Sequence, residues 1–444
     1  MNATSGAGPA PGHLLKILGL SFGIAVAVGN TIGSGILRSP SIIAGEVPGI
    51  ALILGLWVLG GVQAALGANI TAELATALPK SGGSYVYAQR GLGDVGGLIV
   101  GWTIWLSKLA GIAAAAVSFA EFLPIILPSA DAHKIAIAIA LQIAIYAANM
   151  MGLREGRALQ EITSLIKAAM LLLFIIVAIL VVAPAEPRTA LAASPVWSWA
   201  SAILAFQLIR GAYSGWDSPV YFTGENVAPS RTIPRALFYG VALTAALYIG
   251  VNAALLNSLG TSGVAASALP FAAVLHRIGG AIPSLLFALT AMITVASCAN
   301  ANIMSAPRVL LALAEDGLLP RSLRRVNKGG SPNVAFLMTA VGTLALAMSG
   351  TFALVFGLIG TLDSLAGILV DVSYFVLRRR APDLPRPYRA IWHPVLPALV
   401  LAADVALLIL FASANYVGGA VALGLALLCI PFAMLTRRGR DRPA

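Results

Sequence analysis

The chain has 444 residues, of which 59% are hydrophobic and only 10% are charged, whereas a typical soluble domain has about 25% charged residues. This composition indicates a protein that crosses a membrane many times. The net charge of +11 does not indicate a nucleic-acid partner, because the basic residues lie in short clusters between apolar stretches and not on one basic domain. The two cysteines, Cys298 and Cys429, both lie in apolar stretches and predict neither a disulfide framework nor a metal site.

Membrane spans fill most of the chain, and crossing a bilayer takes about 20 mostly apolar residues in a helix. Residues 1–15 are expected to form a short mobile tail, because they lack the basic region and cleavage pattern of a signal peptide. Residues 437–444 form a second, basic tail. Between them the sequence predicts twelve spans, at residues 16–45, 49–77, 97–124, 135–151, 160–183, 197–223, 236–257, 281–306, 333–350, 352–377, 394–412 and 418–436.

The orientation follows from the distribution of Lys and Arg. Most of these 28 residues lie in one set of alternate loops and tails, including 321–328, 378–389 and 437–442. Because basic loops stay in the cytoplasm, both termini are expected to be cytoplasmic, in a multi-pass protein of the cell (inner) membrane.

The first span is interrupted. Residues 28–40 read VGNTIGSGILRSP, with three glycines and three small polar residues between positions 29 and 35. Helix-packing motifs place small residues four apart and do not need a polar cluster, although a helix that is merely kinked for packing remains an alternative. Non-helical backbone at membrane depth is tolerated only inside protein or beside a water-filled cavity, so the pattern predicts a broken helix at an internal site.

The sixth span carries a second interruption, RGAYSGWDSP at 210–219. Paired breaks at corresponding positions of two halves indicate a substrate site at the membrane midplane. N–H groups that begin the half-helix after Gly33, Ser34 and Gly35 would face an anion. The carbonyl groups freed near Thr31 and at 211–214 would face a cation. A ligand with both charges on one carbon, an α-amino acid, fits this pair of helix ends.

Six motifs in the right order carry a resemblance to a known family. Besides NTIGSGIL, they are AELATALPKSGGSYVYAQRGLG (72–93), MGLREGRALQ (151–160), YSGWD with ENVAPSRTIPRAL (225–237), ANIMSAPRVLLALAEDGLLP (301–320) and LRRRAPDLPRP (377–387). The chain resembles the amino acid permeases of the amino acid-polyamine-organocation superfamily along nearly its whole length.

The resemblance implies an all-α polytopic membrane protein with twelve transmembrane helices. They form a leucine-transporter-type five-plus-five inverted repeat, 16–183 and 197–377, with helices 1 and 6 broken, followed by two helices in 394–436. It also implies amino acid transport by alternating access. The expected partners are the amino acid, protons and the lipid bilayer, with no cofactor, no metal, no nucleic acid and no obligate protein partner.

The resemblance also implies site residues. The backbone amides of Gly33, Ser34 and Gly35 would hold the substrate carboxylate, and carbonyls near Thr31, Gly211 and Ser214 would take the amine. Family members often carry an aromatic gate where Gly211 or Ala212 lies here, so Tyr213 or Trp216 would have to serve. The predicted substrate-binding residues are Thr31, Ile32, Gly33, Ser34, Gly35, Gly211, Ala212, Tyr213, Ser214, Gly215 and Trp216.

Lys167 of the fifth span matches a lysine that many members carry where sodium-coupled relatives bind sodium. The resemblance therefore argues against sodium coupling. Two roles stay open: a tether to backbone carbonyls of spans one and eight, or a proton carrier, since an unpartnered lysine inside a membrane tends to lose its proton.

Other charges lie within the predicted spans. Arg210 has three interpretations: contact with an acidic substrate side chain, a pair with Asp217 or Asp363, or a place nearer the outer vestibule. Asp217 is expected to sense protons or to cap a helix end. Lys108 leaves the same alternatives open as Arg210, and for Glu73 a structural ion pair is expected.

These features favour a secondary transporter of amino acids, working by proton symport or by exchange and without sodium. An amine or organic-cation carrier of the same fold is an alternative, but such a substrate would leave the amides of residues 33–35 without a carboxylate. A membrane-embedded hydrolase or receptor is disfavoured, because the spans offer no paired carboxylates, His cluster or Ser/His pair. The sequence also lacks a nucleotide-binding loop of the G-x-x-x-x-G-K-[ST] type, which disfavours ATP as the energy source.

Overall fold

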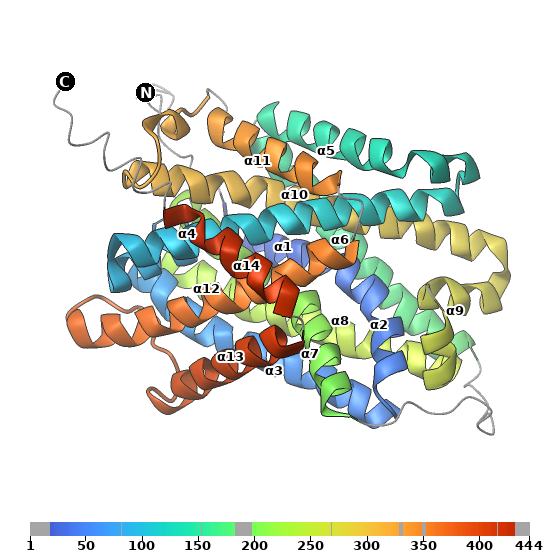
Figure 1. Ribbon diagram of the computed structural model, residues 1–444. Coiled ribbons are helices and arrows are strands. Elements are labelled where there is room, and N and C mark those ends of the chain that lie inside the picture. Colours follow the sequence, from blue (N-terminus) through green and yellow to red (C-terminus); the bar gives the residue numbers. More distant parts are fainter. Residues whose placement is uncertain are drawn as a thin grey trace, which may run out of the picture.

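A computed structural model of the chain describes residues 18–80, 82–151, 153–182, 198–267, 269–327, 332–348, 352–414 and 416–430. The regular elements of these residues are helices, and the remaining pairing is limited to two isolated bridges, Leu18 with Asn226 and Val326 with Pro332. Most helices run in a similar direction and form one bundle (Figure 1). The predicted all-α class is confirmed for the described residues, and the predicted tails at 1–15 and 437–444 lie outside them.

The helices follow the order of the predicted spans. The first half comprises α1 (Leu20–Thr31), α2 (Ser34–Glu46), α3 (Ile50–Ala77), α4 (Ser84–Phe122), the 3-10 helices η1 (Leu123–Ile125) and η2 (Pro128–His133), α5 (Lys134–Met151) and α6 (Leu153–Val181). The second half comprises α7 (Trp199–Tyr213), η3 (Ser218–Glu225), α8 (Pro229–Ala266), α9 (Pro270–Gly279), α10 (Ala281–Glu315), η4 (Arg321–Arg324), α11 (Asn333–Ala347), α12 (Phe352–Arg380), α13 (Val395–Ala414) and α14 (Tyr416–Leu427).

Eight described helices are long and apolar enough to cross a membrane, or nine when the bent pair α1 and α2 is taken as one span. The protein is therefore a multi-pass membrane protein. The other three predicted spans coincide with α7, α11 and α14, whose described parts are 15, 15 and 12 residues long. The count of twelve spans and the inverted repeat remain predictions.

Several helices extend past the apolar stretches that predict them. The helix α4 begins at Ser84, although the predicted span begins at residue 97, and it includes a kink at Gly93, whose φ is +82°. The helix α8 likewise extends from Pro229 to Ala266 around the predicted span 236–257. Hydrophobicity marks the part of a helix that lies in lipid and not the point where its hydrogen bonds end, which explains the difference. The short helix α9 was not predicted.

Burial separates central from peripheral helices. In the most apolar stretch of Ser84–Ile125, 78% of the residues are buried, against 28% for Gln160–Val181 in α6. Large apolar side chains of α6 such as Leu165 and Leu180 are 71% and 78% exposed, which costs little when lipid covers them. The helix α1, which is the first half of the broken span, packs against α6, α8 and α10 (Figure 1). The bundle therefore places the break of the first span at its centre.

Several ion pairs join the helices at one end of the bundle, which we call the basic end. Glu73 of α3 binds Arg378 at 2.6 Å and Arg386 at 3.1 Å and also accepts from the amide of Ala390. This confirms the structural pair expected for Glu73. The other pairs at this end join Lys80 to Asp316 at 2.7 Å and Arg308 to Glu225 at 2.7 Å.

Candidate functional site: two broken helices around one cavity

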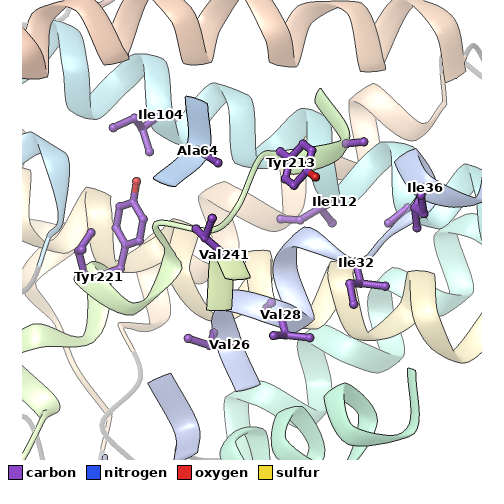
Figure 2. Packing of buried hydrophobic residues seen from close by; sticks show 14 of the residues in the cluster. Val26, Val28, Ile32, Ile36, Ala64, Ile104, Ile112, Tyr213, Tyr221 and Val241 are labelled. Carbon is purple, nitrogen blue, oxygen red and sulfur yellow. The ribbon is translucent and has the colours of Figure 1, made fainter. Parts of the chain in front are cut away.

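The break in the first span lies between Thr31 and Ser34. The helices on its two sides meet at 41°, and the backbone is extended at Ile32 (φ −75°, ψ 97°) and at Gly33 (φ −142°, ψ −150°). Figure 2 shows Val28 on one side of the break, Ile36 on the other and Ile32 at the bend. Among the described residues no side chain caps the first turn of α2, so its leading N–H groups are free for another acceptor. The predicted break is confirmed.

The second break follows Tyr213 at the end of α7. Ser214 is extended (ψ 144°), and Gly215 has a φ of +102°, a conformation that favours glycine. The chain then continues as the 3-10 helix η3 and not as a second α-helix. A Cβ atom on Gly215 would lie 2.8 Å from Nδ2 of Asn30, so the absence of a side chain lets the two breaks approach.

Two polar side chains outside the predicted set of substrate-binding residues connect the breaks. Asn30 of α1 donates from Nδ2 to Oγ of Ser218 at 2.6 Å. The hydroxyl of Tyr248, on α8, lies within donating distance of the carbonyl oxygens of both Thr31, at 2.7 Å, and Ala212, at 3.0 Å. Both side chains are buried. The apolar seventh span contains two tyrosines, Tyr239 and Tyr248, and only Tyr248 is buried.

Lys167 lies behind the first break and is fully buried. Its Nζ donates to the carbonyl oxygens of Gly29 at 2.7 Å and Ile32 at 2.8 Å, both at the end of α1, and of Thr294 on α10 at 3.2 Å. An ammonium has three N–H donors, and each has an acceptor here. Lys167 thus lies beside spans one and eight, a placement that agrees with both a tether and a proton carrier.

The two breaks border one cavity of about 210 Å³. It is lined by ten of the eleven predicted substrate-binding residues, the exception being Ile32, whose side chain is fully buried in the core. Arg210 and Asp217 also line it, whereas Lys167 does not. The helices α3, α4, α10, α12 and α13 supply the remaining walls, with Gln63, Lys108, Asn302, Asp363 and Asp404 among the lining residues.

A comparison of the sequence with known families decides the relationship. The profile of the family described as "Amino acid permease" matches residues 18–432. The chain belongs to this family. The permease shares 27% identity with the large neutral amino acids transporter small subunit 2 of Mus musculus over 402 residues, which is 87% of this chain and 74% of the mouse protein.

Two bacterial relatives cover more of their own length. The serine/threonine exchanger SteT of Bacillus subtilis (strain 168) is 27% identical over 444 residues, 96% of this permease and 98% of SteT. The branched-chain amino acid permease BcaP of Lactococcus lactis subsp. cremoris (strain MG1363) is 25% identical over 414 residues, 87% and 88% of the two chains. The family and these relatives are transporters and not enzymes, so the permease is a membrane transporter of the amino acid-polyamine-organocation superfamily.

The charged residues of the permease cavity form ion pairs and hydrogen bonds that the sequence did not predict. Arg210 pairs with Asp404 of α13, with Nη1 to Oδ1 at 2.7 Å and Nη2 to Oδ2 at 3.3 Å. The expected pair of Arg210 with Asp217 or Asp363 is therefore wrong. Asp363 instead accepts from Ser107 and from Ser214, each at 2.5 Å. Thus α12 is joined directly to the second break.

Asp217 and Lys108 meet at the same tyrosine. Tyr221 donates to Oδ2 of Asp217 at 3.0 Å, and Nζ of Lys108 lies 4.2 Å from the centroid of the Tyr221 ring. A cation over a tyrosine ring is attracted by the ring quadrupole. Lys108 thus lines the cavity beside η3.

The two gate candidates of the permease differ in their surroundings. Tyr213 is buried against Trp57 and Tyr248, with ring centroids 6.0 and 5.1 Å away, and its hydroxyl donates to the Trp57 carbonyl at 3.1 Å. Trp216 is only partly buried and packs over Gly67, where a Cβ atom would lie 3.0 Å from the indole. Tyr213 is therefore held by packing, and Trp216 is the less constrained aromatic side chain of the cavity.

Proposed function

We propose that this permease is a secondary active transporter that carries α-amino acids by alternating access, without sodium and by proton symport or exchange. The single observation that carries the proposal is the meeting of two broken helices at one cavity, with the uncapped start of α2 beside the freed carbonyls at the end of α7. A helix start attracts an anion and a helix end attracts a cation. An amino acid zwitterion carries both charges a fixed short distance apart.

The backbone groups at the two breaks would bind different parts of the substrate. The amides of Gly33, Ser34 and Gly35 would hold the carboxylate, and the carbonyls of residues 211–214, with that of Thr31, would take the ammonium. Tyr248 already donates toward the carbonyls of Thr31 and Ala212, but each carbonyl oxygen has a second lone pair that can accept from the substrate. Trp216 is the gate residue in this proposal, because Tyr213 is fixed by its ring neighbours.

Lys167 supports sodium independence, because its ammonium lies among the carbonyls of Gly29, Ile32 and Thr294. A resident cation at these oxygens leaves no reason for a sodium ion there. Because all three N–H donors have acceptors, we propose that Lys167 stays charged and acts as a tether between α1 and α10.

The proposal extends to topology. The excess of Lys and Arg at the basic end favours a cytoplasmic location for that end and for both termini, in the inner membrane of the cell. The repeats 16–183 and 197–377 would then be oppositely oriented halves. Labelling of single cysteines placed in the loops at Ser129 and Arg321, from either side of sealed vesicles, tests the assignment, and labelling of position 321 from outside intact cells would contradict it.

The first experiment identifies the substrate. Purified permease is heated with each of the twenty amino acids, and a rise in the unfolding temperature marks binding. The decarboxylated amine of each positive amino acid serves as the matched control, since it lacks the group that the α2 amides would bind. Stabilisation by the amino acid and not by its amine supports the proposal, whereas equal stabilisation by both favours the alternative, an amine or organic-cation carrier. A hit is then tested for uptake in proteoliposomes.

A further inference from the structure

A second group of polar and charged residues lines the cavity beside the amino acid site. It consists of Gln63 on α3, Arg210 on α7, Asp371 on α12 and Asp404 on α13, and we call it the Arg210 cluster. Besides the two contacts from Arg210, Asp404 accepts from Nε2 of Gln63 at 2.8 Å. Gly367 of α12 admits the pair, since a Cβ atom there would lie 3.0 Å from Oδ2 of Asp404. Asp404 is therefore a well-satisfied carboxylate.

Asp371 differs from Asp404, because it is buried and one of its two carboxylate oxygens accepts no hydrogen bond from the described residues. It is 6% exposed, it lines the cavity, and its Oδ2 is buried without a hydrogen-bond partner among the described residues. Asp371 lies one helical turn, about 6 Å, from Gly367, where a Cβ atom would lie 3.0 Å from Oδ2 of Asp404 and 3.8 Å from Nη2 of Arg210. An unpaired carboxylate is expensive inside a membrane protein, so this oxygen requires either a donor or a proton.

The net charge of the Arg210 cluster shows whether Oδ2 of Asp371 needs a hydrogen-bond donor or a proton. Two ionised carboxylates and one guanidinium leave a net charge of −1 in a buried place, and one bound proton makes the cluster neutral. Two carboxylates that share a site do not both ionise readily. Since Arg210 and Gln63 both donate to Asp404, the proton belongs on Asp371.

Neighbouring groups do not supply that charge. On α12 itself, Asp363 lies eight residues away, about 12 Å along the helix, and is held by Ser107 and Ser214. Arg378 lies seven residues in the other direction and pairs with Glu73. The helix α4 packs against α12 with Gly91 at Ser373, and the described residues of α14 carry no charge.

The separation from Asp363 also distinguishes this site from the amino acid site. Asp363 contacts Ser214 in the second break, so Asp371 lies about 12 Å further along α12, beyond the length of an amino acid side chain. We therefore expect Asp371 to bind a small cation that occupies the cavity together with the amino acid but is not part of the amino acid.

Resting on the proposed transport function, we propose that Asp371 is the proton-binding site of this permease and that Arg210 links its proton to the movement of α7. Arg210 lies in the last turn of α7, directly before the break, so a movement of the broken helix changes its distance from both carboxylates. While Arg210 is bound to Asp404, Asp371 holds the proton. When the cavity opens to water and Arg210 moves toward Asp371, the O–H bond of Asp371 breaks, water takes the proton, and the carboxylate pairs with the guanidinium. Asp404 keeps its bond from Gln63 and is solvated by the same water in place of the guanidinium.

The test uses the full chain in proteoliposomes that contain a pH-sensitive dye and no internal amino acid. In the wild type, an acidic exterior should accelerate uptake severalfold, with about one proton entering per substrate. In Asp371→Asn the pH difference should have no effect on these vesicles, while exchange, measured in a second set of vesicles loaded with substrate, and stabilisation by the amino acid persist. The matched control is Glu121→Gln, which removes a carboxylate paired with Arg38 outside the cavity and should behave as the wild type.

Each other outcome overturns the proposal. Gradient-driven uptake that survives in Asp371→Asn, or wild-type uptake that ignores the pH difference, means that Asp371 carries no coupling proton. If amino acids still stabilise the protein in that case, the transport function stands and only this inference is lost. If a sodium gradient drives uptake and Asp371→Asn abolishes that dependence, the cation is sodium and not a proton.

A measurement on the wild type keeps the inference testable even if Asp371→Asn does not fold. Protein labelled with 13C-aspartate should show, in its infrared spectrum at neutral pH, the carbonyl band of a protonated aspartic acid shifted by the label. Absence of this band contradicts the proposal, because Asp371 would then be ionised while Arg210 is bound to Asp404.

Discussion

The side-chain amide of Asn30 donates to the hydroxyl of Ser218 at 2.6 Å and so joins the two broken helices directly. The residues are 188 positions apart, one at the last turn of α1 and the other at the start of η3. Gly215 lies beside this bond, and because it has no side chain it does not push Asn30 away from Ser218. The proposed amino acid site lies between these two helix ends, so we expect its geometry to depend on this contact.

Removal of that bond should therefore affect substrate binding as well as stability. We expect Asn30→Ala and Ser218→Ala each to cost about 1–3 kcal/mol of stability, because each leaves a buried polar partner unsatisfied. The double variant should show a coupling of about 0.5–3 kcal/mol in a cycle measured by thermal unfolding. Ser413→Ala, at an exposed serine bonded only within its own helix, is the control. A coupling of zero would show that the bond does not hold the breaks together.

Substitution of Gly35 should be severe. The sequence alone predicts that Gly35→Val abolishes binding by blocking the approach of a carboxylate while the protein stays folded. The structure alters the reason, because a Cβ atom on Gly35 would lie 2.8 Å from Cα of Ala212 and would push α2 and α7 apart. We expect even Gly35→Ala to lower stability by about 1–3 kcal/mol and to weaken binding. Gly55→Ala on α3, where nothing lies within 4 Å, should be harmless, and equal behaviour of the two variants would contradict the packing argument.

Lys167→Met distinguishes a tether from a proton carrier. A tether holds α1 in every half-cycle, so its loss should slow both gradient-driven uptake and exchange at least tenfold, and each buried carbonyl left without a donor costs about 1–3 kcal/mol. Both rates are measured in proteoliposomes loaded with buffer or with substrate. Lys134→Met, at an exposed lysine paired with Asp131, is the control. Normal exchange with loss of gradient-driven uptake alone would make Lys167 the proton carrier.

Arg210→Ala should leave substrate selectivity unchanged, since its guanidinium is occupied by Asp404. Glutamate and aspartate should compete no better and no worse than they do against the wild type. The variant should nevertheless lose about 3–5 kcal/mol of stability, because it leaves the Asp404 carboxylate without its counter-charge. The double variant Arg210→Met/Asp404→Leu should recover most of that loss. A specific loss of competition by acidic amino acids would return Arg210 to the substrate site.

The sequence by itself determined the membrane class, the interruptions at 29–35 and 210–219 and the family. These features are local: apolar length reports burial in lipid, and a cluster of glycine and small polar residues reports non-helical backbone wherever it occurs. For the same reason ten of the eleven predicted substrate-binding residues line one cavity, since they flank two breaks that the sequence already located.

Only the tertiary structure decided which side chains meet across the bundle. Arg210 pairs with Asp404, 194 positions away, and not with Asp217 or Asp363, because the packing of α7 against α13 sets the distance and the sequence does not encode it locally. Asn30, Tyr248 and Asp371 were not among the predicted site residues for the same reason, since a polar residue in an apolar span carries no sign of its partner. Whether a buried charge finds a partner depends on the helix opposite it, and that depends on the whole fold.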